Sequence, residues 1–281
     1  MGDVDAQYRA AFKSAGVRAE ASARSPRKLR VGLIGLGAIG RALVDLIARD
    51  RASPLVVVGA LVRDVVRHER DGVKTVASLS ELMDLEPNVV AEAAGHSAVR
   101  EWGPQCLRAS IPLVMLSVGA LADPSLEDEL RACALEGDTR LELPSGGVGG
   151  LDVIASAANG GIDRVVHTLV KPPRALGVDV DARTVIFAGT AREAAAKFPQ
   201  NANVAAAIAF AGVGLDRSQV VIVADPEATT NRSEIEVIGT FGRAAVVIDN
   251  KPSESNPKTA AIVAMSLKHA LEKHCDPIII G

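Results

Sequence analysis

Three glycines stand at a spacing that would let the backbone approach a phosphate group. The segment reads Gly35, Leu36, Gly37, Ala38, Ile39 and Gly40. It directly follows the apolar run Leu29–Ile34 and precedes an apolar-periodic stretch over residues 41–47. In a strand–turn–helix unit the first glycine permits a tight turn, the second admits a pyrophosphate and the third allows close packing, while the helix N-terminus supplies N–H donors. The pattern therefore predicts a dinucleotide-binding turn made by Gly35, Gly37, Ala38, Ile39 and Gly40.

The two residues after the next apolar run bear on which dinucleotide binds. Leu55–Val62 is strand-sized and is followed by Arg63 and Asp64. A carboxylate at the end of the second strand accepts a hydrogen bond from the ribose 2′-OH of NAD, whereas an arginine there pairs with the 2′-phosphate of NADP. We therefore expect both NAD and NADP to be used, with Arg63 as a cofactor contact. The alternative is that Asp64 serves the ribose while Arg63 stays in solvent.

The elements that position this turn alternate between strand and helix through the first half of the chain. The later predicted strands are 55–62, Val89–Ala93 and Ile111–Leu116, and the later predicted helices are Ala98–Ala109 and Pro124–Glu136. This alternation is typical of an α/β fold with a doubly wound parallel sheet, the Rossmann type. Such sheets bind ligands at the carboxyl ends of their strands. His96, which comes shortly after Val89–Ala93, is therefore expected at the binding edge.

A Gly- and Pro-rich run, Leu143–Gly150, separates this half from the rest of the chain. Residues 29–145 are predicted to form the dinucleotide-binding domain, preceded by a flexible extension over residues 1–28. The strands predicted beyond the run are Val165–Val170, Thr184–Ala188, Gln219–Val223, Glu234–Thr240 and Ala244–Asp249, with helices at Ala191–Lys197 and Val204–Ala211. They indicate an α+β domain with a mostly antiparallel sheet over residues 146–256. Asn256 and Pro257 predict the start of a last helix, Lys258–Glu272, as its N-cap and first residue.

Composition excludes several classes of function. The chain has 281 residues, with 31 Lys and Arg against 34 Asp and Glu, so its net charge of −3 argues against a nucleic-acid partner. No apolar run approaches the ~18 residues of a membrane span, so no membrane association is expected. The three cysteines are too few and too scattered for a disulfide framework and favour the reducing cytoplasm. No spacing of His, Cys, Asp or Glu indicates a metal site.

Several segments, taken in order, resemble the L-aspartate dehydrogenase family from about Leu29 to the C-terminus. They are Ser117–Asp123, Pro144–Asp152, Lys171–Pro173, Phe198–Ala205, Ala224–Pro226 and Pro252–Thr259. The resemblance implies NAD(P)-dependent oxidation of L-aspartate to iminosuccinate, which hydrolyses to oxaloacetate and ammonia, or the reverse reaction. It also implies a homodimer in which residues 146–256 form the substrate and dimerisation domain, with residues 257–281 packing back on the nucleotide domain.

One position departs from that family's pattern. The family's catalytic histidine follows shortly after an Ala-Asp-Pro segment, and the corresponding residue here is Ser233. A serine hydroxyl can hydrogen-bond a carboxylate or a water, but it does not hold a proton near pH 7 as imidazole does. Either another group does the acid–base work, or activity is reduced, or the substrate has changed.

The remaining candidates for site residues come from strand ends and loops. The catalytic candidates beside Ser233 are Lys171, as a carboxylate or carbonyl contact, and His96, as a surviving histidine. A solvated lysine is the alternative for Lys171, and cofactor contact or a helix N-terminal position is the alternative for His96. Asn203 resembles the family's nicotinamide-contacting asparagine. We also expect backbone N–H groups of Ala120 and Gly147 to contact the cofactor.

Two other functions stay open on the sequence alone because of Ser233. One is a dehydrogenase or imine reductase of the same architecture that takes another amino or keto acid. The other is an NAD(P)-binding homologue with impaired catalysis. The first would oxidise or reduce the cofactor with a different substrate, and the second would bind the cofactor without turnover.

Overall fold

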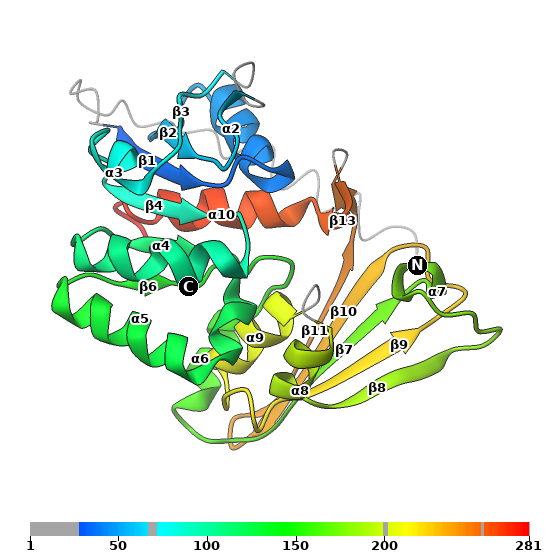
Figure 1. Cartoon of the computed structure of the whole chain (residues 1–281). Coiled ribbons are helices and arrows are strands. Elements are labelled where there is room, and N and C mark those ends of the chain that lie inside the picture. Colours follow the sequence, from blue (N-terminus) through cyan, green and yellow to red (C-terminus); the bar gives the residue numbers. More distant parts are fainter. Residues whose placement is uncertain (1–27, 67–71, 199–201, 254–255, 281) are drawn as a thin grey trace, which may run out of the picture.

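The chain folds around two β-sheets. The computed structural model describes residues 28–66, 72–198, 202–253 and 256–280, and Figure 1 shows the two sheets at opposite ends of the molecule with helices between them. The extension predicted for residues 1–28 lies outside the described residues except for Lys28.

The first sheet is parallel throughout, as predicted. Its strand order is β3–β2–β1–β4–β5–β6. The strands are β1 (Leu29–Ile34), β2 (Leu55–Leu61), β3 (Thr75–Val76), β4 (Val89–Glu92), β5 (Leu113–Met115) and β6 (Leu141–Glu142). The central strands are aliphatic on both faces because helices cover both. The reversal of strand order between β1 and β4 is the point at which doubly wound sheets bind their ligands.

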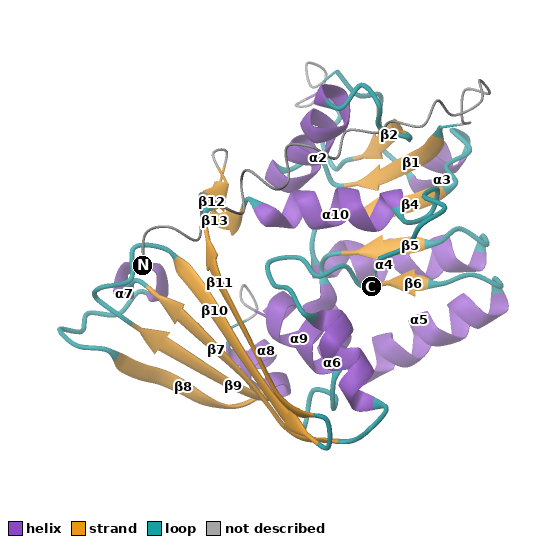
Figure 2. Cartoon of the chain, turned by 180° about the vertical axis from the view of Figure 1, so that it is seen from behind, coloured by secondary structure: helices purple, strands orange, loops and turns teal. Residues whose placement is uncertain are grey.

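Helices pack on both faces of this sheet. They are α2 (Ala38–Arg49), α3 (Leu79–Met83), α4 (His96–Arg108), α5 (Pro124–Glu136) and α10 (Ile262–Glu272). Leu43 of α2 and Leu267 of α10 lie in one buried cluster, and Leu107 of α4 and Leu130 of α5 lie in another. Figure 2 shows α2 and α10 together on the near face, with α4 and α5 behind the sheet.

The second sheet is mixed and mostly antiparallel, again as predicted. Its order is β11–β10–β7–β9–β8, and only the β7–β9 pair is parallel. The strands are β7 (Ile162–Lys171), β8 (Thr184–Thr190), β9 (Gln219–Ala224), β10 (Asn231–Gly239) and β11 (Gly242–Asn250). Helices α6 (Leu151–Ala158), α8 (Ala191–Lys197) and α9 (Ala202–Ala211) lie on the face that turns toward the first sheet, and the short α7 (Pro173–Leu176) follows β7. Because β10 begins at Asn231, Ser233 lies inside a strand.

The predicted start of the last helix is wrong. Residues Asn256–Ala260 form strand β13, which pairs with β12 (Pro252–Ser253), and α10 begins only at Ile262. The Ala261 N–H donates to the Lys251 carbonyl at 2.9 Å, which closes this hairpin. Backbone pairing between the two short strands therefore outweighs the local N-cap signal of Asn256 and Pro257. The helix that follows packs on α2 and on the nucleotide sheet.

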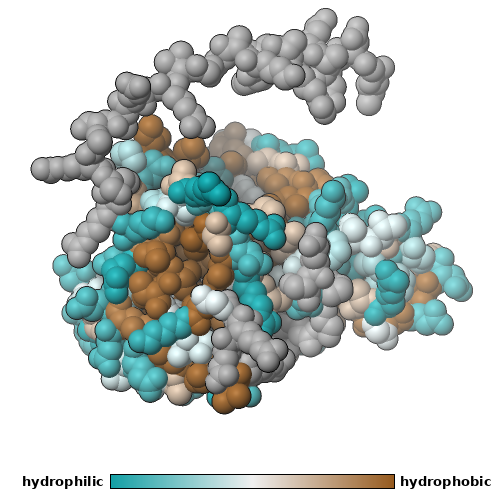
Figure 3. Space-filling model, turned by 90° about the horizontal axis from the view of Figure 1, so that it is seen from above, coloured by the Kyte–Doolittle hydropathy of each residue, from teal (hydrophilic) through white to brown (hydrophobic). Residues whose placement is uncertain are grey.

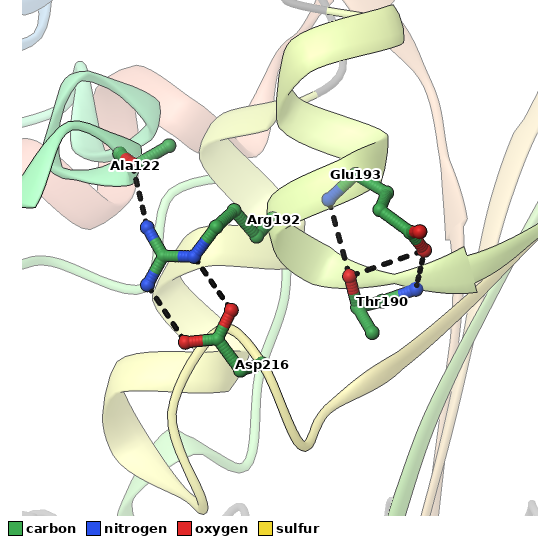
Figure 4. A network of polar contacts seen from close by, with 5 residues as sticks. All are labelled: Ala122, Thr190, Arg192, Glu193 and Asp216. Atoms are coloured by element: carbon green, nitrogen blue, oxygen red, sulfur yellow. Dashed lines mark hydrogen bonds and ion pairs between the residues drawn. The ribbon is translucent and has the colours of Figure 1, made fainter.

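Polar contacts tie α8 to a turn of the first half of the chain. Arg192 donates through Nε and Nη2 to the Asp216 carboxylate at 2.6 and 2.9 Å, and through Nη1 to the carbonyl of Ala122 at 2.6 Å (Figure 4). Thr190 and Glu193 form a reciprocal capping box at the start of α8. Ala122 ends the 3₁₀ turn η3 (Val118–Ala122), which follows β5. The network holds the second sheet's helices against a loop at the carboxyl edge of the first sheet.

The surface seen from above mixes hydrophobic and hydrophilic side chains. Figure 3 shows hydrophobic residues gathered over the nucleotide sheet within a hydrophilic border, while the lobe of the second sheet is mostly hydrophilic. Within the described ranges, no helix is long and apolar enough to cross a bilayer.

Candidate active site

The glycine turn has the internal geometry that a bound pyrophosphate requires. Gly35 has φ +93°, and a Cβ there would lie 2.7 Å from the Cβ of Ala94. A Cβ on Gly40 would lie 2.4 Å from the Gly35 carbonyl oxygen. By contrast, a Cβ on Gly37 would meet open space. Gly35 and Gly40 are therefore required by the fold, whereas Gly37 leaves room for a ligand to approach the backbone.

The N-terminus of α2 faces this open space without a side-chain cap. Its N-cap is Gly37, no side chain accepts from its first turn, and that turn has no acidic residue. Unsatisfied N–H groups and the positive end of the helix dipole form an anion site. The turn thus fits the pyrophosphate of a dinucleotide, with Ala38 as the first residue of the helix.

A pocket of about 560 Å³ adjoins the glycine turn. Its walls include Gly35, Gly37, Arg63 and Asp64, so the structure brings together the glycines and the pair predicted to contact the ribose. The lining residues that the sequence interpretation missed include Arg41 on α2 and Glu101 and Trp102 on α4. Arg41 directly follows Gly40, the last glycine of the motif. This position next to the glycine turn could have identified it as a lining residue from the sequence.

A buried carboxylate organises the edge of the sheet next to this pocket. Glu92, the last residue of β4, is 0% exposed. Its carboxylate accepts hydrogen bonds from the N–H groups of Ala94 and Gly95, both at 2.7 Å, and from the N–H and hydroxyl of Ser117 at 3.0 and 2.9 Å. Burial raises the pKa of Glu92, and these donors oppose that rise. Glu92 therefore holds in place the loops that lead to His96 and to η3. The sequence interpretation gave Glu92 no role, although an acidic residue at the end of an apolar strand could have indicated one.

Asn203 joins those two loops to the second sheet's helices. Its Oδ1 accepts from the Gly119 N–H at 2.9 Å and lies 3.0 Å from His96 Nε2. Because Gly119 N–H is a donor, the contacting amide atom must be the oxygen, and His96 Nε2 must carry a proton. The amide hydrogens on Asn203 Nδ2 are not engaged by these two bonds. Asn203 is therefore oriented, and His96 acts on it as a hydrogen-bond donor.

A second pocket of about 200 Å³ lies where the two sheets' units meet. Its lining includes five residues predicted for the site or the motif, which are Ile39, Gly147, Lys171, Asn203 and Ser233. The sequence interpretation missed the polar lining residues Ser145, Asn231, Asn250 and Thr259. Because they lie in separate loops and strands, no local spacing connected them.

His96 and Ala120, which were also predicted for the site, are in the lining of neither pocket. His96 contacts the pocket only through Asn203. Ala120 is 4% exposed, and its N–H donates to the Ser117 carbonyl at 3.0 Å within η3. That N–H is therefore engaged inside the turn, while the N–H of the preceding residue, Gly119, is held by Asn203.

Lys171 supplies a cation at the end of β7. It is the single charged residue among the described lining of the second pocket. Partial burial lowers the pKa of its ammonium group because desolvation disfavours the charged form. A lysine in this position can hold a carboxylate by charge-assisted hydrogen bonding.

Ser233 lines the same pocket, and its hydroxyl contacts a buried histidine on the side away from the pocket. Its Oγ is 3.1 Å from Nε2 of His167 on the neighbouring strand. Both residues are buried, with 2% and 1% exposure. Burial lowers the pKa of His167 to about 4, so its imidazole is neutral near pH 7. The sequence placed His167 in a strand without a role, because strand pairing was needed to bring it to Ser233.

No cluster of His, Cys, Asp and Glu suited to a metal ion occurs among the described residues. The described site comprises a glycine turn that fits a pyrophosphate, a pocket beside it, and a smaller polar pocket with one cation. These features are typical of NAD(P)-dependent dehydrogenases, which position a small substrate beside the nicotinamide.

Comparisons with known proteins identify the family within that class. Residues 152–274 match the family model "Aspartate dehydrogenase, C-terminal", and residues 35–144 match "Homoserine dehydrogenase, NAD binding domain". The L-aspartate dehydrogenase of Cupriavidus necator is 38% identical over 90% of this chain and 100% of its own length. That of Pseudomonas aeruginosa is 37% identical, again over 90% of this chain and 100% of its own length. The chain belongs to the L-aspartate dehydrogenase family, whose members are oxidoreductases that use NAD or NADP.

Solved structures agree with this assignment. The crystal structure of aspartate dehydrogenase from Thermotoga maritima superposes with a TM-score of 0.76 at 28% identity, covering 90% of this chain and 99% of that one. A hyperthermophilic archaeal homoserine dehydrogenase in complex with NADPH shares the fold, with a TM-score of 0.58 at 14% identity over 88% of this chain and 97% of that one.

Proposed function

We propose that this chain is an NAD(P)-dependent L-aspartate dehydrogenase that converts L-aspartate to iminosuccinate, which hydrolyses to oxaloacetate and ammonia, and that also runs the reverse amination. The observation that carries the proposal is the match over the whole length of L-aspartate dehydrogenases. The polar pocket with its single cation supports the same substrate class, because a dicarboxylate needs a positive partner and several hydrogen-bond donors.

A nicotinamide dinucleotide bound here would supply the acceptor for the hydride of the substrate Cα, and this chain's residues would hold and orient it. Gly35, Gly37 and the N-terminus of α2 hold the pyrophosphate, and Arg63 and Asp64 contact the adenosine ribose and any 2′-phosphate. Asn203, oriented by Gly119 and His96, donates from Nδ2 to the nicotinamide side of the site, and the loop at Gly147 borders it. These roles rest on the lining of the two pockets and on the hydrogen bonds of Asn203.

Two side chains of the second pocket act on the substrate itself. Lys171 binds a carboxylate and keeps the dicarboxylate oriented toward the cofactor. Ser233 places a hydroxyl beside the reacting amine or the attacking water. His96 contributes indirectly, by holding Asn203 in place.

We also propose that the protein is a cytoplasmic homodimer. The helices of the second sheet lie on one face, and on the opposite face Val185 and Val247 are 59% and 51% exposed. Exposed valines on the sheet face opposite the helices favour burial against a second copy. The three cysteines are unpaired, which suits a reducing compartment. Sedimentation velocity tests the dimer, and a concentration-independent monomer would contradict it.

The activity is tested by following NADH and NADPH oxidation with oxaloacetate and ammonia, and NAD(P)⁺ reduction with L-aspartate. We expect turnover with both cofactors. Alanine and glutamate serve as comparison substrates, because each lacks the four-carbon dicarboxylate skeleton. Faster turnover with either of them, or cofactor binding with no turnover on any of them, would overturn the proposal.

A further inference from the structure

Ser233 and His167 form a polar pair whose cross-strand neighbours in the second sheet are aliphatic. In the register of β7 and β10, Ser233 lies opposite Leu169 and His167 lies opposite Ile235. His167 also lies beside Val220 of β9. These neighbours are buried and aliphatic. An aliphatic residue at position 167 would pack there without desolvating a polar ring, so the buried imidazole carries a desolvation cost.

The imidazole makes a single hydrogen bond, and that bond leads to the pocket. Nε2 contacts Ser233 Oγ at 3.1 Å, while Nδ1 is buried and has no partner among the described residues. A histidine that serves only structure is usually bonded at both ring nitrogens, which fixes its tautomer. Here nothing fixes it. Nε2 can either donate to Ser233 or accept the Ser233 hydroxyl proton.

Ser233 is the link between the buried ring and a ligand. Its side chain lines the pocket that also contains Lys171 and Asn203. A serine hydroxyl donates one proton and accepts through two lone pairs, so it can bond to His167 and to a ligand at the same time. We propose that Ser233 and His167 form a proton relay, in which Ser233 touches the substrate and His167 is the positioning residue that holds the proton behind it.

The relay rests on the proposed function and balances in both directions. In deamination, a proton leaves the substrate ammonium group for Ser233 Oγ as the hydroxyl proton of Ser233 moves to His167 Nε2. The amine becomes neutral, its lone pair assists loss of the hydride from Cα, and His167 becomes imidazolium. Loss of the hydride leaves a protonated imine. Water adds to this imine and releases one proton to solvent, and the proton on His167 returns through Ser233 to the departing ammonia, so deamination releases one proton overall. Amination follows these steps in reverse.

Charges around His167 decide when it can hold that proton. Burial is the cause that lowers its pKa to about 4, so the ring is a neutral acceptor in the ligand-free protein. On the sheet face that carries His167, the cation contributed by β7 is Lys171. Strand β9 and helix α9 have no charged residue. Glu234 and Glu236 of β10 alternate with Ser233 and Ile235, so they lie on the opposite face. A bound dicarboxylate brings two negative charges into the pocket. It offsets Lys171 and stabilises the imidazolium, so proton transfer is tied to substrate binding.

The kinetic test compares Ser233→Ala, Ser233→Thr, His167→Gln and the double variant Ser233→Ala/His167→Gln with wild type. Glutamine keeps a hydrogen-bonding group near the Nε2 position but does not titrate. We expect Ser233→Ala and His167→Gln each to lower kcat about 100-fold, with KM for aspartate changed less than about threefold, as for loss of a general acid–base group. The double variant should be no slower than either single variant, and Ser233→Thr should keep most of the activity.

The matched control is Ser218→Ala, because Ser218 is a buried serine outside the pocket lining. It should leave kcat unchanged. Full kcat in His167→Gln would reduce His167 to a space-filling role, and additive losses in the double variant would show that the two residues act separately. Either result overturns the relay. No turnover of wild type with aspartate or with oxaloacetate and ammonia would instead contradict the proposed function.

A second measurement does not depend on turnover or on the folding of the variants. The pKa of His167 is followed by NMR in ¹⁵N-histidine-labelled wild type with NAD⁺, with and without saturating succinate, a dicarboxylate that has no amine. We expect succinate to raise the pKa of His167 by about one pH unit or more. An unchanged pKa would mean that His167 cannot hold the proton and would overturn the relay.

Discussion

The pocket beside the glycine turn and the pocket between the two sheets' units differ in which parts of the chain form their walls and in whether backbone or side chains face the ligand. The first takes its lining from consecutive elements, β1 through α4, and its ligand-facing groups include the backbone of Gly35 and Gly37. The second takes Lys171 from β7, Asn203 from α9, Ser233 from β10 and Thr259 from β13. Its polar side chains converge from strands and helices that are far apart in the chain.

This difference shows which physical requirement makes each site costly to the stability of the folded protein. In the nucleotide pocket, glycines avoid side-chain clashes, and a helix N-terminus supplies donors that are unsatisfied in any helix. In the second pocket Lys171 is partly desolvated, and next to the pocket His167 is buried with one hydrogen bond, to Ser233. The residues of the nucleotide pocket are therefore constrained mainly by steric fit. The residues at the second pocket are constrained mainly by the cost of burying polar and charged groups.

The largest effect should come from Gly35→Ala, with Gly37→Ala as its matched partner. Gly35→Ala forces a Cβ against Ala94 at a positive φ, and we expect a loss of roughly 2–4 kcal/mol in the free energy of unfolding. Gly37→Ala should change that free energy by less than about 0.5 kcal/mol but weaken cofactor binding. Urea unfolding and cofactor titration check both. Equal destabilisation by the two variants would remove the distinction between a fold glycine and a ligand glycine.

Lys171→Met should weaken binding of the substrate without changing binding of the dinucleotide. Loss of the charged hydrogen bond should raise KM for L-aspartate about 10- to 100-fold, at an unchanged affinity for NAD⁺. Because burial lowers the pKa of Lys171, its cation is lost at a lower pH than for an ordinary lysine, so KM for L-aspartate should begin to rise at a lower pH than an ordinary lysine would give. Lys171→Arg should shift this rise to higher pH. A KM independent of pH in wild type would argue against Lys171 as the carboxylate partner.

The buried histidine should make the protein sensitive to acid. The pKa of His167 is about 4 in the folded chain and about 6.5 when unfolded, so the unfolded state binds more protons between these values. Stability contributed by the neutral ring is complete above pH 6.5 and falls as pH drops toward 4, by about 2 kcal/mol at pH 5. The difference in unfolding free energy between pH 7.5 and pH 5 should shrink by this amount in His167→Gln. An identical pH dependence in wild type and variant would contradict the buried neutral state.

The smallest effect should come from the adenosine end of the nucleotide pocket. Arg63→Ala should lower the preference for NADP over NAD by roughly tenfold, because an exposed arginine–phosphate pair contributes modestly. Asp64→Asn is the converse variant and should weaken NAD more than NADP. Ratios of kcat/KM for the two cofactors provide the measurement. A preference unchanged by Arg63→Ala would indicate that Arg63 stays in solvent and that Asp64 alone serves the ribose.

The order of elements was predictable because most of it follows from local pattern. Helix α5 and helix α8 begin and end where their caps and apolar periodicity place them, at Pro124–Glu136 and Ala191–Lys197. The last helix was mispredicted because its apparent cap, Asn256, is instead paired in β13. Short elements such as β3 and β6 have too few residues to show a period. They exist because neighbouring strands provide backbone partners.

By itself the sequence determined the phosphate-binding turn, the two kinds of sheet and the resemblance to L-aspartate dehydrogenases, because each depends on residues close together in the chain or on segments in a fixed order. The tertiary structure alone decided that Asn203 is held by Gly119 and His96, that Glu92 braces two loops, and that His167 stands behind Ser233. The contact between His167 and Ser233 depends on strand register, because a shift of one residue would turn a strand side chain to the other face of the sheet. The contacts of Asn203 depend on how helix α9 packs against the loops at the edge of the first sheet.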